Sequence, residues 1–392
     1  MSETFRCHRG VRQGCILSPF LFAFFISDLT KHLKENGCRG IQVHDTEILD
    51  LMFADDLAVC ADSVVGLQRA LNALNSYCHK WGLTVNEEKT TVMVFRKGGA
   101  LRKNEKWLYE GSRVEVVNTY KYLGTLISSS GRWFRAQEAL AGQASKALFI
   151  MKKNMAKFGT LPPDLTFKMF NTLILPIMTY CCELWGFHGA NQLDILHSKF
   201  CKFFLGVGQS TSNVAVRGEL GRYPLGVLRR ISIVKFWLKL LEMNDIRYSK
   251  KCYKMLCDLE KVGRGAWVSE VSGLLFSKGL GEAWVNQSIG NKNAFIALFK
   301  KRIVTQDIEQ WKVEIMTSNR LATYSTVKDR FAVEKYLKVL TNFEQRRAIA
   351  RLRCAGHNLN IEKGRHTKTE KRARLCQLCS EGVVEDEYHF VL

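Results

Sequence analysis

The feature that most restricts the fold of this chain is a pair of adjacent aspartates, Asp55 and Asp56, between two short apolar runs. The segment 47–62 reads EILDLMFADDLAVCAD, a pattern that predicts two buried strands joined by a turn that carries both aspartates. Adjacent carboxylates repel each other, so a hydrophobic hairpin has little structural reason to carry both at its tip. A hard divalent cation would bind the carboxylate oxygens and offset the repulsion. Aspartate is also common in turns, so a metal site and a plain turn both remain open here.

Three further blocks surround this pair in a fixed order. They are RGVRQGCILSPFLF at residues 9–22, GLTVNEEKT at residues 82–90 and YKYLG at residues 120–124. Together with FADD at residues 53–56, they resemble motifs B, D, E and C of the reverse transcriptases of non-LTR (LINE-type) retrotransposons. Each block alone is weakly specific, but four blocks in the family's order and with similar spacing strongly favour that resemblance.

The resemblance implies an RNA-directed DNA polymerase that adds deoxynucleotides by phosphoryl transfer. In the intact parent protein two Mg²⁺ ions, about 3.5–4 Å apart, would stabilise the attacking and leaving oxygens. Asp55 would bind metal, and Asp56 would support that site or the primer end. Lys89, in the motif D block, would protonate the leaving pyrophosphate. A surface lysine at the start of a strand is an equally good interpretation of Lys89.

The same resemblance implies contacts with an RNA template, a DNA primer or target, and deoxynucleotides. In the family the motif B loop packs against the templating base pair, and here that loop contains Arg12, Gln13 and Gly14. Glycine would let the backbone approach the pair closely, whereas a solvated loop is the alternative for the two long side chains. The motif E residues would form a primer grip: Tyr122, Leu123 and Gly124.

The apolar pattern predicts an α+β chain in four parts. We expect a partial right-hand polymerase palm, built of a sheet and helices, at residues 1–130 and a helical thumb at residues 131–205. A mostly helical region without an assignable role would follow at residues 206–350. A basic segment with an incomplete CCHC-type zinc knuckle would end the chain at residues 351–392.

Two helical predictions bear on the site. Residues 19–34 predict one helix whose buried face includes Phe20, Phe24, Phe25, Leu29 and Leu33. Residues 165–185 predict another helix, kinked at its internal proline. The sequence TYCCELWG, at residues 179–186, resembles a recurring feature of the family's thumb, although a buried corner of a helical bundle is the preferred interpretation of Glu183 and Trp185.

The net charge favours a polyanionic partner. Lysine and arginine number 58 against 37 acidic residues, giving +21, and the basic residues are spread along the whole chain. General basic solubility and attraction to an acidic membrane are the alternatives, but no amphipathic anchor and no apolar run of membrane-spanning length is evident. Thirteen scattered cysteines and the lack of a secretory signal predict an intracellular protein, cytoplasmic or nuclear. The oligomeric state is not predicted.

The C-terminal segment predicts a zinc site. Cys376 and Cys379 have the CxxC spacing of half a site, and His389 is a third candidate ligand. A redox CxxC is the rival, but it normally belongs to a βαβ fold that this sequence does not predict. By the resemblance, the fourth ligand would be a cysteine beyond Leu392, so Zn²⁺ binding is expected to be possible but incomplete.

The resemblance also predicts that the chain is truncated at both ends. The family's motif A, with its own metal-binding aspartate, would precede motif B, and Asp28, Asp45 and Asp50 all follow motif B. We therefore expect this chain alone to be inactive as a polymerase. The alternatives are a non-catalytic relic that binds nucleic acid and, less well supported, a protein similar to a group II intron maturase.

Overall fold

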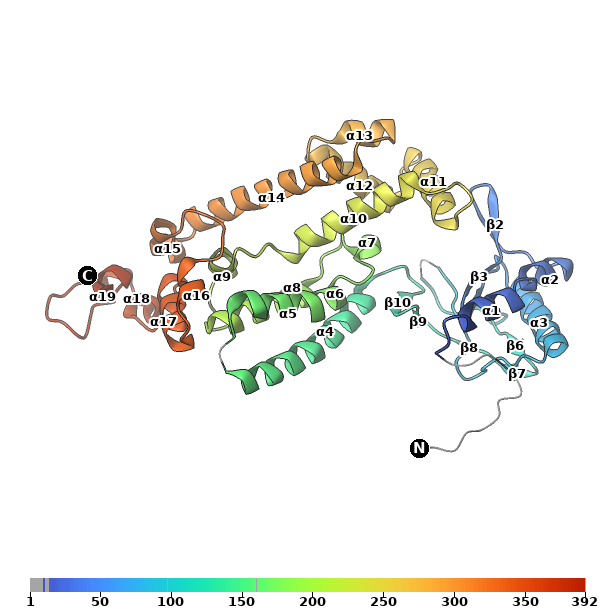
Figure 1. Ribbon diagram of the computed structural model, residues 1–392, viewed down its shortest axis with the longest axis horizontal. Helices are drawn as coiled ribbons and strands as arrows, with labels where there is room; N and C mark the ends of the chain where they lie inside the picture. Colours follow the sequence, from blue (N-terminus) through green and yellow to red (C-terminus); the bar gives the residue numbers. More distant parts are fainter. Residues whose placement is uncertain (1–9, 11–13, 97, 160, 392) are drawn as a thin grey trace. The chain divides into compact units, whose positions relative to one another are not determined.

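The computed structural model describes all residues except 1–9, 11–13, 97, 160 and 392, and it has a mixed α+β fold with small sheets and many helices (Figure 1). The chain forms two compact units. The first comprises residues 1–122, 127–132 and 243–268, and the second comprises residues 123–126, 133–242 and 269–392. The α+β class predicted from the sequence is confirmed, while the four-part division remains a prediction.

The first unit holds most of the strands, and each of its sheets has two strands. The antiparallel pairs are β1 (Ile41–Val43) with β2 (Thr46–Ile48), β3 (Asp50–Phe53) with β4 (Asp56–Val59), and β6 (Leu108–Tyr109) with β7 (Ser112–Arg113). Strand β5 (Thr91–Val92) pairs in parallel with β8 (Glu115–Val116), and β9 (Thr119–Tyr122) pairs with β10 (Thr125–Ser128).

Helix α3 (Val64–Trp81) organises the core of the first unit. Ser63 caps its start, because the Ser63 hydroxyl accepts the Gly66 N–H at 3.1 Å. Gly82 ends it with a left-handed φ of 63°, a conformation that costs glycine little. The buried face of α3 packs with α2 (Leu29–Glu35) and the small strands, and its core includes Leu33, Leu49, Leu74 and Tyr77.

The single helix predicted over residues 19–34 is wrong. The structure has two helices, α1 (Ser18–Phe25) and α2, and Leu29 and Leu33 are buried whereas Phe20 and Phe24 are 73% and 75% exposed. The Tyr77 hydroxyl donates to the carboxylate of Asp28, which ties the start of α2 to α3. The predicted buried face is therefore limited to α2.

Helix α11 (Tyr248–Lys261) belongs to the first unit although it lies far along the chain. Lys251 Nζ lies 2.7 Å from Asp45 Oδ1, at the turn of the β1–β2 hairpin. The other side of that turn carries His44, whose Nε2 lies 3.5 Å from Asp258 Oδ2. Ion pairs from α11 thus hold a hairpin that local sequence patterns would leave without a partner.

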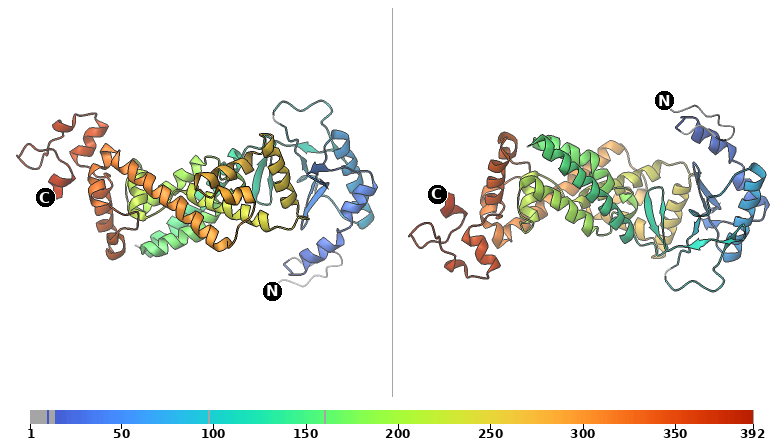
Figure 2. Two further views of the ribbon diagram at one scale, coloured as in Figure 1. Left: turned by 90° about the horizontal axis from the view of Figure 1, so that it is seen from above. Right: turned by 90° about the horizontal axis from the view of Figure 1, so that it is seen from below.

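The second unit is helical. Its elements are α4 (Phe134–Met155), η1 (Ala156–Phe158), α5 (Pro163–Leu173), α6 (Leu175–Met178), α7 (Cys182–Trp185), α8 (Asn191–Leu205), α9 (Asn213–Leu220), α10 (Leu225–Glu242), most of α12 (Ala266–Ser277), α13 (Gly281–Asn286), α14 (Lys292–Met316), η2 (Asn319–Leu321), α15 (Ala322–Val327), α16 (Lys335–Val339), α17 (Phe343–Arg353), α18 (Asn360–His366), η3 (Lys371–Ala373) and α19 (Glu387–Val391). Helix α4 packs on α8, and α14 runs alongside α10 (Figure 2). The core between α5, α7 and α8 contains the fully buried Phe170, Trp185 and Phe200.

The kinked helix predicted over residues 165–185 is three helices, α5 to α7. Pro176 does not kink a continuous helix but stands in the first turn of α6, where its missing N–H costs nothing. Cys181, with a φ of 53°, turns the chain before α7. In the part of the chain that the structure describes, no helix has the length and apolar character needed to cross a membrane.

Candidate metal and nucleic-acid sites

The two adjacent aspartates lie at the tip of the β3–β4 hairpin, as predicted. Phe53 pairs with Asp56, which leaves Ala54 and Asp55 as a two-residue turn. Ala54 has a φ of 54°, a left-handed conformation that costs a residue with a Cβ about 1–2 kcal/mol. Strained backbone of this kind is found preferentially at functional sites.

Both carboxylates at the tip are open to solvent. Asp55 and Asp56 are exposed, and neither carboxylate forms a hydrogen bond or ion pair with another residue that the structure describes. The prediction of fully buried flanking strands is wrong at Met52 and Phe53, which are 40% and 61% exposed. Burial begins at Asp50, which accepts a hydrogen bond from Thr30 Oγ1 at 3.0 Å and whose pKa is raised by burial. The hairpin is anchored at its base and free at its tip.

Motif E comes close to this tip. The pKa of Tyr122, the last residue of β9, is raised first by partial burial and next by the negative charge of Asp56. Tyr122 therefore lies within range of the Asp56 charge, although 65 residues separate the two in the sequence. Two residues singled out by separate motifs therefore share one neighbourhood within the first unit.

The aspartate pair fits a magnesium site of the open kind. Mg²⁺ is usually held by one or two protein carboxylates together with water and substrate phosphates, rather than by a closed cage of side chains. Asp55 and Asp56 offer such oxygens on an unobstructed turn. Among the described residues, no third acidic, histidine or cysteine side chain joins them in a metal-binding group.

The motif D residue Lys89 lies in a turn just before β5. Asn86 shapes this turn, because its Oδ1 accepts the Lys89 N–H at 3.1 Å and its carbonyl accepts the Thr90 hydroxyl at 2.8 Å. The Lys89 side chain is exposed and has no ion pair with another described residue. This geometry is compatible with a proton donor and with a surface lysine, so the role of Lys89 stays a prediction.

Of the motif B residues, Arg12 and Gln13 lie outside the described part of the chain. Gly14 is described and has a φ of 82°, which favours glycine, and a Cβ at this position would meet nothing within 4 Å. The backbone conformation therefore explains why glycine stands at position 14, and a close approach of this backbone to the templating base pair stays a prediction.

The three predicted zinc ligands come together at the C-terminus. The ligand atoms of Cys376, Cys379 and His389 all lie within 4.8 Å of one another, and Cys379 Sγ is 3.2 Å from His389 Nε2. Tetrahedral zinc with Zn–S near 2.3 Å and Zn–N near 2.0 Å places its ligand atoms about 3–4 Å apart. The pKa of Cys376 is lowered, first by the Leu378 N–H that it accepts at 3.3 Å, which favours the thiolate that zinc requires.

Local hydrogen bonds shape this cluster. The Cys376 N–H donates to the Val383 carbonyl at 2.8 Å, and Leu375 and Val384 form a β-bridge beside it. The His389 N–H donates to Asp386 Oδ1 at 3.0 Å, and this bond holds the first turn of α19, which carries the candidate ligand His389. The residues present thus fit three of the four positions of a structural zinc site.

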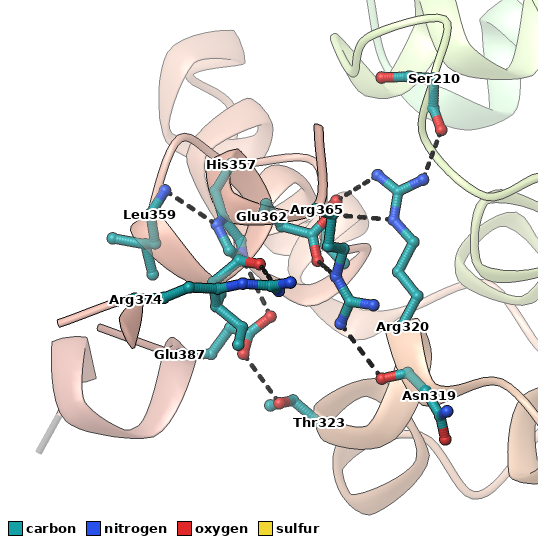
Figure 3. Close-up of polar contacts among 12 residues, drawn as sticks. Ser210, Asn319, Arg320, Thr323, His357, Leu359, Glu362, Arg365, Arg374 and Glu387 are labelled. Atoms are coloured by element: carbon teal, nitrogen blue, oxygen red, sulfur yellow. Dashed lines mark hydrogen bonds and ion pairs between the residues drawn. The ribbon is translucent and has the colours of Figure 1, made fainter. Parts of the chain in front are cut away.

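The cluster is fastened to the helices before it, a connection that the sequence did not reveal (Figure 3). Glu387, two residues before a candidate ligand, bonds His357 Nε2 at 2.9 Å and accepts the Thr323 hydroxyl at 2.9 Å. Nearby, Glu362 accepts Arg320 Nε at 3.0 Å and Arg365 Nε at 2.6 Å. Glu362 and Arg365 are neighbours within α18, whereas the contacts of Glu387 with His357 and Thr323 and of Glu362 with Arg320 join segments far apart in the sequence.

Comparisons with known proteins agree with the motifs. Residues 2–127 match the family model described as reverse transcriptase (RNA-dependent DNA polymerase). The chain is 25% identical to the RNA-directed DNA polymerase from mobile element jockey of Drosophila funebris, over 49% of this chain and 21% of that protein. It is 27% identical to the Pol polyprotein from the type-1 retrotransposable element R2 of Popillia japonica, over 40% of this chain and 29% of that protein. The Pol polyprotein from the type-2 element R2DM of Drosophila melanogaster is 31% identical over 33% of this chain and 13% of its own length.

The chain spans less than a third of the length of each of these three relatives. Within that span, the matched family covers all four sequence blocks, and the relatives are polymerases and polyproteins of non-LTR elements. The resemblance drawn from the motifs is confirmed: residues 2–127 match the reverse transcriptase family, and the chain is similar to RNA-directed DNA polymerases of non-LTR, LINE-type retrotransposons.

Proposed function

We propose that this chain provides the metal-binding and primer-holding part of an RNA-directed DNA polymerase. The observation that carries the proposal is the FADD turn, where two solvent-open carboxylates stand on a strained backbone inside a segment that matches reverse transcriptases. A carboxylate pair with no partner of its own is suited to a ligand that arrives with the substrate.

In this proposal the first unit acts as a palm, and α4 to α8 act as a thumb that holds the template–primer duplex. Asp55 binds Mg²⁺, and Asp56, beside Tyr122, supports that site or the primer end. Bound magnesium would lower the cost of charge that develops on the reacting phosphate oxygens. The new bond joins the primer 3′-oxygen to the α-phosphorus, and the bond from that phosphorus to pyrophosphate breaks.

The remaining motif residues take supporting roles. Lys89 gives a proton to the departing pyrophosphate, and the loop with Arg12, Gln13 and Gly14 lies against the templating base pair. The Tyr122-Leu123-Gly124 turn holds the primer end. RNA template, DNA primer or target, and deoxynucleotides are the partners, and the cytoplasm or nucleus is where such partners are found.

At the C-terminus, Cys376, Cys379 and His389 bind Zn²⁺ as a structural ion. Two thiolates and one imidazole are the ligand types that zinc prefers, and the described cluster has suitable spacing. Because ligand binding and local folding are coupled in small zinc sites, the ion would stabilise the segment around it.

A second candidate is nucleic-acid binding without catalysis. It is favoured by the net charge of +21, which is independent of the aspartate pair. The two candidates differ in whether Asp55 matters for more than binding.

Template–primer binding and magnesium-dependent extension test both candidates together. Anisotropy with an RNA–DNA template–primer should show affinity falling by about tenfold or more between about 50 and 200 mM salt, with little sequence preference. Asp55→Asn should bind at least as tightly, because only a negative charge is lost. An affinity that does not change with salt would contradict both candidates.

Primer extension tests the catalytic part of the proposal. Magnesium-dependent extension that is lost in Asp55→Asn would establish catalysis and would make the expectation of inactivity wrong. In a longer parent protein that extends primers, Asp55→Asn should remove extension and spare binding, because the lost interaction acts in the transition state. Undiminished extension there would overturn the catalytic proposal.

A further inference from the structure

The turn between β9 and β10 is held from outside by a tyrosine that no motif assigns a role. Leu123 and Gly124 form this turn, with φ values of 46° and 83°. Positive φ at both positions is the requirement of a type I′ hairpin turn, and Leu123 adopts it in spite of its Cβ. A non-glycine residue in this conformation needs support from its surroundings.

Tyr180 supplies that support. Its hydroxyl donates to the Leu123 carbonyl at 2.7 Å. Its ring covers Gly124 so closely that a Cβ there would lie 3.3 Å from Tyr180 Oη and 3.4 Å from Tyr180 Cε1. The φ of Gly124 favours glycine, and a Cβ there would press on the Tyr180 ring. These residues all belong to the second unit.

Tyr180 is itself fixed by the rest of the TYCCELWG segment. The Trp185 indole N–H donates to the Tyr180 carbonyl at 3.0 Å, and Trp185 is fully buried in the helical core. The next residue, Cys181, turns the chain with a φ of 53° and accepts the Thr125 hydroxyl at 3.1 Å. The segment thus joins a buried tryptophan to the tip of the motif E hairpin through a partly exposed tyrosine.

We infer that Tyr180 is a positioning residue for the primer end, acting through the Leu123 carbonyl and the Gly124 backbone. This inference rests on the proposed role of the Tyr122-Leu123-Gly124 turn as the primer grip. The buried corner expected for Glu183 and Trp185 is confirmed at Trp185, which is fully buried. Tyr180, for which the sequence predicted no role, is 43% exposed, and its hydroxyl contacts the turn. The segment therefore supports the primer-grip turn: Trp185 is buried in the helical core, and Tyr180 contacts the turn.

The test removes the Tyr180 hydroxyl and observes the primer end directly. This chain is saturated with an RNA–DNA template–primer that carries 2-aminopurine as the primer 3′-terminal base, and anisotropy of a distant dye measures binding in the same sample. Tyr180→Phe should keep the ring packing and the affinity. Its change in 2-aminopurine fluorescence should fall by about threefold or more, the population shift expected when one such hydrogen bond is lost.

Two further variants make the result specific. Tyr248→Phe on α11 is the matched control, because that hydroxyl forms no hydrogen bond with another described residue, and it should leave both signals unchanged. Gly124→Ala attacks the same contact from the other side and should reduce the primer-end signal as Tyr180→Phe does.

The outcomes separate this inference from the function on which it rests. A wild-type chain that binds but leaves the 2-aminopurine signal unchanged would overturn the primer-grip proposal and the inference with it. A wild-type signal that Tyr180→Phe preserves in full would overturn the role of Tyr180 alone. Loss of the signal in Tyr180→Phe and Gly124→Ala, with unchanged affinity and an unchanged Tyr248→Phe, supports the inference.

Discussion

Carboxylates occupy two opposite environments in this chain. Asp55 and Asp56 stand exposed on a strained turn, without a partner among the described residues. Glu219, at the end of α9, is fully buried and saturated: it accepts the Tyr336 hydroxyl at 2.8 Å and Arg353 Nη2 at 3.1 Å. Burial and the charge of Glu219 together raise the pKa of Tyr336.

The difference in burial and hydrogen bonding distinguishes a carboxylate that stabilises the fold from one that is available to bind a ligand. A buried carboxylate without donors would be costly, so Glu219 is surrounded by donors that the protein itself provides. The exposed pair lies open to solvent. The left-handed conformation of the preceding Ala54 costs free energy, and no contact of the pair within the described part of the chain offsets that cost. The two sites should therefore respond in opposite ways to neutral substitution.

The largest effect is expected at Glu219. Glu219→Ala leaves Arg353 and Tyr336 without their shared acceptor and should lower the free energy of unfolding by about 3–5 kcal/mol. Asp55→Asn should change it by less than about 0.5 kcal/mol. Urea denaturation of both variants measures the contrast. Similar losses in the two variants would remove the distinction between the sites.

The second largest effect concerns zinc. If the C-terminal cluster is structural, saturating Zn²⁺ at about 100 times its dissociation constant should stabilise the segment by about 2.7 kcal/mol. Hydrogen exchange of α19 and the neighbouring α18 reports this stabilisation, which a chelator should reverse and Cys376→Ser should abolish. Magnesium added at the open hairpin should not protect β3 and β4 in the same way. Zinc that leaves exchange in α18 and α19 unchanged would argue against a structural ion.

The third effect is a dependence on pH in the core of the second unit. Burial, and next the nearby Arg222, lower the pKa of His197 to about 3, and Arg222 Nε donates to His197 Nε2 at 3.3 Å. Below about pH 6.5 the histidine binds a proton in the unfolded state but stays neutral in the folded state. The free energy of unfolding therefore decreases as the pH is lowered, by about 1.4 kcal/mol per pH unit. The loss between about pH 6.5 and 5 should reach about 2 kcal/mol.

Variants isolate the histidine from the titrating carboxylates. His197→Gln should flatten the slope between about pH 6.5 and 5, whereas His188→Gln, at an exposed position, should leave it as in the wild type. Stability measured by urea at several pH values decides between them. An unchanged slope in His197→Gln would mean that the buried imidazole does not carry the dependence.

The smallest effect tests the strain at the hairpin tip. Ala54→Gly removes the Cβ that is strained by the left-handed backbone, but it raises the entropy of the unfolded chain. The free energy of unfolding is expected to rise by about 0.5 kcal/mol. Ala58→Gly, inside β4, should be destabilising, because it brings the entropy cost without relief of strain. Loss of stability in both variants would show that the turn is not strained.

The sequence predicted features whose causes lie within a few residues. The FADD hairpin depends on local backbone and side-chain chemistry, and it is confirmed. Long-range contacts were not predicted. Lys251 and Asp45, which are 206 residues apart, join α11 to a hairpin, and the Glu219 cluster draws Arg353 from another helix.

The wrong predictions have the same origin. Helical spacing indicated that Phe20 and Phe24 face a core. Spacing shows which residues share one face of a helix, but it does not show whether another element packs against that face, and both side chains are exposed. Pro176 was expected to kink a helix because its neighbours are helical, yet the chain breaks earlier and uses the proline as a helix start. At the candidate site, residue types were predictable, whereas the support from Tyr180, His357 and Thr323 depended on tertiary packing.

The most direct test of the open-site account is divalent metal binding at the hairpin. Mn²⁺, used in place of Mg²⁺ and followed by electron paramagnetic resonance, should bind this chain in the presence of an RNA–DNA template–primer and the next deoxynucleotide. Asp55→Asn should weaken that binding by about tenfold or more, because a charged oxygen ligand is lost. Asp62→Asn, a neutral substitution at an exposed aspartate seven residues away, should leave it unchanged. Equal Mn²⁺ affinity in the wild type and Asp55→Asn would contradict the account.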